Sequence, residues 1–276
     1  MKPGWLCLLL LLHCHLTSAQ QRPLVTEPVT PVQKGHLLLD IGFEFLEDAQ
    51  FPFSGLRGDL TRMGALGLRL GAGDAVEVQV LGSLQNFLNI DQRQPAPNSP
   101  RLDFLGDSTS DFGDFALATK VRLARERGSR PALGSRFGVE LPNSSNESGL
   151  GNDQTNAFGS FLIEKNIAPV TILANLGLEI LSDPRTTGSQ DGLFAYGLAI
   201  LYPVNSRFTL VAETHGRAGQ GGPGTEERSL FRLASQIRAG GLTWDVGALW
   251  GTRHTDPNWG LVLGLSREIP LPLLDF

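Results

Sequence analysis

Apolar and polar residues alternate with a period of two along most of the chain after residue 36. In the segment 37–45 every odd position is large and apolar, and Asp40, Gly42 and Glu44 stand between them. Strict alternation of this kind predicts a β-strand with one apolar face. The pattern recurs in eleven further segments, which are 65–70, 76–81, 114–123, 133–141, 157–164, 172–180, 194–202, 208–215, 231–238, 244–250 and 259–266. The sequence therefore predicts twelve strands, an even number.

The connections between these segments alternate in length. Those after the odd-numbered segments span roughly 6 to 25 residues, are rich in Asn, Asp, Ser, Gly and Pro, and are longest at 86–110. Those after the even-numbered segments are tighter, as at 71–74. Long connections at one rim and short turns at the other are typical of bacterial outer-membrane β-barrels. A meander of hairpins also needs no crossover helices.

Alternation alone does not say which face looks outward, because a soluble barrel or β-sandwich would place its apolar side inside. The polar face carries charges mixed with many Gly, Ala and Ser residues, which suits a crowded lumen better than a solvated exterior. Two residues separated by six positions on a tilted strand climb roughly 16 Å, so paired aromatics could mark both edges of an apolar band about 25 Å tall. The predicted aromatic girdle consists of Tyr196, Tyr202, Trp244, Trp250 and Trp259.

Backbone groups decide how such a chain can enter a membrane. Each unpaired N–H or C=O in hydrocarbon costs several kcal/mol, so an exported strand meander must close into a barrel. In an eight-stranded barrel the inward side chains just fill the interior. A barrel of twelve strands is wider and therefore permits a narrow pore or cavity. The chain ends in Phe276, as is common in outer-membrane barrels, but Pro270 and Pro272 interrupt the preceding segment and put the closing strand in question.

The N-terminus reads as a secretory signal peptide. One positive charge, an apolar block at 5–12 and the trio Thr17, Ser18 and Ala19 predict cleavage after residue 19. The domains expected are a signal peptide at 1–19, an extended Pro-containing leader at 20–35 and a β-barrel at 36–276. Both cysteines, Cys7 and Cys14, fall in the segment removed, so the mature chain has none. We expect the outer membrane of a Gram-negative bacterium as the location.

The charges of the chain indicate which partners it can bind and which residues line its lumen. A formal charge of −5 with interspersed acids and bases argues against nucleic acid. Acids and bases on neighbouring strands could form a salt-bridge lattice that fills the lumen, or a lining that selects solutes. The residues that strand parity places inside are Asp40, Glu44, Arg69, Glu77, Lys120, Arg122, Arg136, Glu140, Glu179, Glu213, His215, Arg232, Arg238 and Asp245.

Catalytic signals are sparse. Glu213 and His215 share a face, and His254 and Asp256 lie in the connection before the last strand. No serine stands at the spacing of a nucleophile elbow, and no His or Cys pair has metal-ligand spacing. We therefore expect neither an enzyme nor a cofactor or metal.

Several short motifs resemble a known family. They are 113–123 (GDFALATKVRL), 130–134 (RPALG), 138–142 (GVELP), 248–251 (ALWG) and 260–265 (GLVLGL). Together they resemble the outer-membrane proteins of the meta-pathway of phenol degradation, over about residues 60–266. The resemblance implies a transporter-like barrel that admits small aromatic or hydrophobic compounds, and it transfers no catalytic residue.

The sequence thus predicts an antiparallel up-and-down transmembrane β-barrel acting as a passive channel for small molecules. Its expected partners are outer-membrane lipid, the outer-membrane assembly machinery and a small-molecule solute. Three alternatives stay open. They are a structural or adhesive barrel with a plugged lumen, a membrane hydrolase using His215 or His254, and a soluble β-sandwich.

Overall fold

A computed structural model describes residues 22–271 of the chain, and nearly all regular structure in that range is antiparallel β-sheet. The predicted signal peptide and Phe276 lie outside the described residues. The strands are β1 (His36–Phe51), β2 (Leu56–Gly71), β3 (Val76–Arg93), β4 (Ser108–Asp111), β5 (Phe115–Ala124), β6 (Ala132–Leu141), β7 (Asn156–Ile167), β8 (Val170–Ser182), β9 (Gln190–Pro203), β10 (Phe208–Ala218), β11 (Arg228–Ala239), β12 (Leu242–Gly251) and β13 (Trp259–Pro270). One 3-10 turn, η1 (Ser99–Arg101), interrupts the connection after β3. No helix among the described residues is long and apolar enough to cross a membrane.

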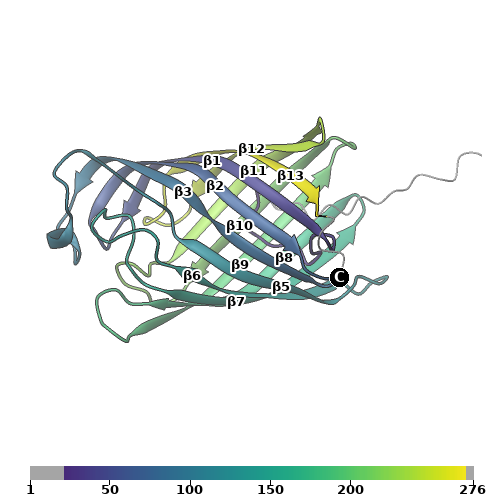
Figure 1. The fold of residues 1–276 in the computed structure, drawn as a ribbon, viewed down its shortest axis with the longest axis horizontal. Helices are drawn as coiled ribbons and strands as arrows, with labels where there is room; N and C mark the ends of the chain where they lie inside the picture. The colour runs from purple at the N-terminus through teal and green to yellow at the C-terminus, as the bar shows by residue number, and fades with distance from the viewer. Residues whose placement is uncertain (1–21, 272–276) are drawn as a thin grey trace, which may run out of the picture.

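The sheet closes on itself as a barrel (Figure 1). Neighbours in sequence pair in antiparallel order, β3 pairs β5, and β1 pairs β13 to seal the cylinder. Twelve strands make the wall, as predicted, while the short β4 pairs only with the end of β3. Pro270 is the last residue of β13 and stands opposite His36, so it ends the closing pair without interrupting it.

The two rims differ as the sequence predicts. Short turns join β2 to β3, β7 to β8, β9 to β10 and β11 to β12, and the long connections gather at the other end, on the left in Figure 1. Two expectations are wrong. The predicted connection 86–110 is β-strand at both ends, because β3 continues to Arg93 and β4 begins at Ser108. The connection between β1 and β2 is the short segment 52–55. The two strands are 16 residues each and take up the positions that were predicted to form the loop.

The apolar face of the sheet points outward. Many of the alternate apolar side chains on the wall strands are 37 to 68% exposed, whereas their polar neighbours are covered. This orientation is that of a barrel in lipid and excludes a β-sandwich with an internal apolar face. The outward residues include Val78, Leu117, Phe137, Val139, Phe161, Leu176, Leu178, Phe194, Leu198, Ile200, Leu210, Leu233, Val246, Leu261 and Leu263.

A bulge in β2 changes which residues of that strand face the lumen. Gly64 has a φ of +65°, and the pairing of β1 with β2 shifts register beside it. Toward the short turns the buried residue is the odd-numbered Arg69, but beyond Gly64 it is the even-numbered Leu60 that is buried. The bulge therefore brings Arg62 into the lumen, where it contacts Glu44 at 3.2 Å.

The long-loop half of the lumen holds an apolar core on one side. Its members come from β1, β2, β3, β12 and β13 and are at most 7% exposed. This cluster narrows the lumen beside the wall strands that close the barrel. It consists of Leu46, Ala49, Leu56, Leu60, Leu88, Leu249 and Val262.

Candidate functional site

The lumen of the barrel is crossed by its own N-terminal segment. Residues 22–35, which we call the N-terminal strap, have no regular secondary structure and lie inside the wall before β1 begins. Leu24 packs against a buried group from β8 to β11, and Val29 packs against Ala132 and Leu162. These strap side chains are at most 5% exposed, so the strap is part of the packed interior.

Carboxylates on the wall bind the backbone of the strap. Glu213 accepts hydrogen bonds from the N–H groups of Val25 at 2.9 Å and Thr26 at 2.6 Å. Glu164 does the same for the consecutive N–H groups of Val29 at 2.9 Å and Thr30 at 3.1 Å. These bonds satisfy four backbone donors of the strap, in two consecutive pairs, as a buried irregular backbone requires.

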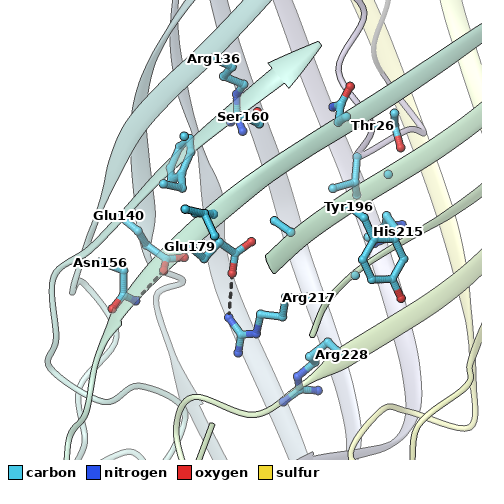
Figure 2. A pocket seen from close by; sticks show the side chains of 18 of the residues that line it. Thr26, Arg136, Glu140, Asn156, Ser160, Glu179, Tyr196, His215, Arg217 and Arg228 are labelled. Carbon is cyan, nitrogen blue, oxygen red and sulfur yellow. Dashed lines mark hydrogen bonds and ion pairs between the residues drawn. The ribbon is translucent and has the colours of Figure 1, made fainter. Parts of the chain in front are cut away.

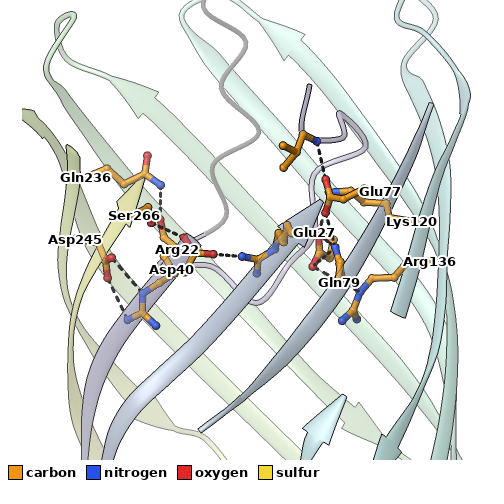
Figure 3. A network of polar contacts seen from close by, with 12 residues as sticks. Arg22, Glu27, Asp40, Glu77, Gln79, Lys120, Arg136, Gln236, Asp245 and Ser266 are labelled. Carbon is orange, nitrogen blue, oxygen red and sulfur yellow. Dashed lines mark hydrogen bonds and ion pairs between the residues drawn. The ribbon is translucent and has the colours of Figure 1, made fainter. Parts of the chain in front are cut away.

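A first network of charges joins the strap to β3, β5 and β6 (Figure 3). The Nζ of Lys120 lies 3.2 Å from a carboxylate oxygen of Glu27 and 3.1 Å from one of Glu77. Gln79 donates to Glu77 at 2.7 Å and accepts from Arg136 at 2.8 Å. All five charged and polar groups therefore have partners, which is the condition under which buried charges are tolerated.

A second network lies across the lumen on β1, β2, β11, β12 and β13 (Figure 3). The Nε of Arg22 in the strap lies 3.3 Å from Asp245, and Gln236 donates to the carbonyl oxygen of Arg22 at 2.7 Å. On the wall, Asp40 pairs with Arg69 and accepts a hydrogen bond from the hydroxyl of Ser266.

Glycines on the inner face leave the volume that the strap occupies. A Cβ added to Gly42 or Gly264 would lie 2.2 to 2.3 Å from the Arg22 guanidinium group. A Cβ at Gly197 would lie 2.6 Å from the Oγ1 of Thr26. The small residues of the polar face thus accommodate a specific segment of this chain.

Two cavities lie on the long-loop side of the strap and share Arg136 and Glu140 in their walls. One, of about 410 Å³, is bounded by β5 to β11 and has Val25 and Thr26 of the strap at its base (Figure 2). The other, of about 440 Å³, lies toward β1, β2 and β3. A small solute could occupy either cavity, but the strap stands between them and the short-turn end.

The predicted lumen residues fall into three groups. Seven are inside and at most 4% exposed; these are Asp40, Arg69, Glu77, Lys120, Glu213, Arg232 and Asp245. Five are half-buried and line the cavities; these are Glu44, Arg136, Glu140, Glu179 and His215. Arg122 and Arg238 have the predicted parity but lie beside the short turns, where Arg122 donates to the carbonyl of Asp74 and Arg238 is exposed.

The predicted lattice of cross-strand ion pairs exists in part. Glu77 and Lys120 are register partners on β3 and β5, and Glu213 stands opposite Arg232, 3.5 Å away, on β10 and β11. Sequence reasoning missed the charges that complete these networks. They are Arg22 and Glu27 of the strap, Arg62 beyond the bulge, Glu164 at the end of β7, and Arg217 and Arg228 near the long loops.

The aromatic girdle lies on the outer face. Tyr202, Trp244, Trp250 and Trp259 are 39 to 49% exposed, and Trp259 packs against Phe45 with ring centroids 5.7 Å apart. Tyr196 is less exposed because it crosses the outer side of Gly216 and donates to the hydroxyl of Ser229 at 2.8 Å. Large side chains that cover a strand glycine in this way help to pin the register.

Two of the candidate catalytic residues, Glu213 and Asp256, accept hydrogen bonds from backbone N–H groups. Asp256 is buried and accepts hydrogen bonds from the N–H groups of Ser229 and Arg253, at 3.0 and 2.9 Å. His254 is exposed beside it, and His215 lies 3.5 Å from Glu213, which itself binds the strap. Between residues 22 and 271, no group of three or more His, Cys, Asp or Glu side chains is arranged to hold a metal.

Comparisons with known proteins support the fold. No family model matches the sequence, and no curated protein matches it. Among solved structures, an outer membrane channel from Pseudomonas putida F1 is similar with a TM-score of 0.63 and 15% identity, over 87% of this chain and 98% of that one. The NanC porin is similar with a TM-score of 0.55 and 11% identity, over 84% of this chain and all of that one. At these identities the likeness concerns the barrel architecture, which is that of outer-membrane proteins.

Proposed function

We propose that this barrel is an outer-membrane channel for the passive uptake of small molecules, and that its N-terminal strap is a gate. The carrying observation is that wall carboxylates hold the strap inside the lumen at residues 25–30, whereas its backbone hydrogen bonds to the wall are at its last residue, where Gly35 donates to Gly71 and accepts from Leu271. A segment attached in this way can leave without opening the backbone ladder of the barrel. In the closed state the two cavities on the long-loop side would hold a solute that has not yet passed.

The class of solute follows from the cavities and from the family resemblance. Cavities of about 410 and 440 Å³ are of a size that takes small organic molecules. Resemblance to the outer-membrane proteins of the meta-pathway of phenol degradation favours small aromatic or hydrophobic compounds. Export through a cleaved signal peptide and insertion by the outer-membrane assembly machinery belong to the same proposal.

A second candidate is a structural barrel whose lumen stays closed. The observation that favours it is the density of the networks around the strap, in which Glu27, Glu77 and Lys120 are all at most 2% exposed. The two functions differ in one property, because only the channel releases its strap under working conditions.

The experiment tests release of the strap in a barrel that has already folded. A protease recognition sequence is inserted between Lys34 and Gly35, the barrel is folded and placed in a planar bilayer, and the strap is then cut from the wall strands. The channel function predicts rare openings before cleavage and frequent discrete openings after it. The same insertion between Thr187 and Gly188, in the connection after β8, is the control and should leave conductance unchanged. A cut barrel that never conducts would establish the closed structural barrel instead.

A further inference from the structure

Two arginines face one another directly across neighbouring strands. Arg217 on β10 and Arg228 on β11 are register partners, and both line the cavity of about 410 Å³ (Figure 2). Like charges in directly opposite positions of an antiparallel pair are destabilising. The barrel therefore maintains an unfavourable arrangement at the long-loop end of its lumen.

The partners of these arginines orient them but neutralise them only in part. Arg228 donates to the carbonyl oxygens of Thr255 at 3.0 Å and Gln50 at 3.3 Å, and its nearest carboxylate, that of Glu226, is 4.0 Å away. Arg217 has one carboxylate partner, Glu179 at 3.3 Å, and also donates to the backbone of Glu226 at 2.7 Å. Carbonyl oxygens fix a guanidinium group without cancelling its charge. Arg217 thus has one close carboxylate, and the carboxylate nearest Arg228 is 4.0 Å away.

Both guanidinium groups remain accessible from the cavity. The side chains of Arg217 and Arg228 are 22 and 31% exposed, in contrast to the fully buried Lys120. A planar guanidinium group offers paired donors that match the two oxygens of a carboxylate, and two such groups side by side can bind one anion together.

The rest of this cavity offers apolar surface. Phe158 points inward from β7, and the Arg136 guanidinium group lies over its ring, 4.6 Å from the centroid. Leu181 and Leu230 also line the wall, the first of them 4% exposed. A ligand that fits both parts has one anionic end and an apolar body.

We propose that Arg217 and Arg228 bind the carboxylate of a small organic acid, with the apolar part of that acid against Phe158 and Leu230. The role of this site in uptake rests on the proposed channel function, but the binding step does not require the strap to move. The site lies on the long-loop side of the strap, which is the extracellular side in outer-membrane barrels.

Equilibrium binding to the full-length protein in detergent tests the proposal. The probes are cyclohexanecarboxylate and its neutral isostere cyclohexanecarboxamide, titrated by calorimetry. We expect the acid to bind, the amide to bind at least tenfold more weakly, and Arg228→Gln to weaken the acid about tenfold through loss of charge-assisted hydrogen bonds. Arg238→Gln is the matched control, because it removes the same charge from the other end of β11, where the side chain is exposed. Its affinity should stay within about twofold of the native protein.

Three results would overturn the site. They are equal affinity for acid and amide, absence of binding to the native protein, and equal loss in Arg228→Gln and Arg238→Gln. If Arg228→Gln does not migrate as a folded, heat-modifiable barrel, Arg217→Gln takes its place, and the comparison of acid with amide stands on the native protein. Binding without conductance after strap cleavage would refute the channel and keep the site, whereas conductance without binding would do the reverse.

Discussion

Glu213 is the wall residue whose replacement should open the lumen most selectively. Its carboxylate accepts hydrogen bonds from Val25 at 2.9 Å and Thr26 at 2.6 Å and lies 3.5 Å from Arg232. Glu213→Gln keeps the shape of the side chain and removes its charge. A hydrogen bond to a charged acceptor contributes about 1.5–3 kcal/mol and a neutral one about 0.5–1.5, a difference of about 1 kcal/mol per bond. Two bonds then amount to about 2 kcal/mol, or an increase of about 30-fold in the population with a released strap.

The assay is the open probability of single channels in a planar bilayer. Glu179→Gln is the control, because Glu179 also faces the lumen and pairs with Arg217 without touching the strap. We expect the open probability to rise about 30-fold in Glu213→Gln and to stay near the native value in Glu179→Gln. Equal open probabilities in both variants and the native protein, with both folded as heat-modifiable barrels, would refute the idea that these bonds hold the gate.

Three further predictions follow from the same contacts. Gly197→Ala should raise the open probability at least about fivefold, because its new Cβ would meet Thr26 and such overpacking costs about 1–3 kcal/mol. Single-channel recording compares it with Gly192→Ala, whose new Cβ would have no atom within 4 Å and should leave the open probability unchanged. Lys120→Met should lower the free energy of unfolding by about 3–5 kcal/mol in urea titrations, since it removes the buried cation between Glu27 and Glu77 and leaves Glu27 with Arg136, at 3.5 Å, as its ion-pair partner. Lys165→Met, which breaks a partly exposed pair with Glu126, should cost less than about 1 kcal/mol in the same titration. Brominated lipids should quench Trp244, Trp250 and Trp259, all outward-facing, and unquenched emission would contradict the lipid-facing wall.

The wall of the barrel was predictable because the side-chain period of a strand is local. Alternation in segments such as 194–202 locates a strand and its two faces without knowledge of its neighbours. It fails where the ladder is irregular. At 65–70 the even-numbered residues face outward, and continuing that alternation would place Leu60 and Arg62 on the outer face. The bulge at Gly64 reverses the parity of β2, so both residues face inward.

The strap could not be predicted from its own pattern. Residues 22–35 carry Pro23, Pro28 and Pro31 and no alternation, and their place in the lumen depends on wall residues far away in sequence, such as Glu213. One signal was present on the wall. The inner face has glycines such as Gly42, Gly197 and Gly264, where a side chain would be expected to fill the lumen. Space left by the wall indicates an occupant from elsewhere in the chain.

A reversible covalent lock on the strap tests the central claim most directly. A Cβ at Gly197 would lie 3.3 Å from the Cβ of Thr26, a little below the roughly 3.5–4.5 Å of a disulfide, and the predicted mature chain has no other cysteine. The double variant Thr26→Cys with Gly197→Cys is recorded in one bilayer before and after reduction. A strap that gates a channel predicts a silent barrel while oxidised and discrete openings once reduced. Identical conductance in the two states would contradict the account.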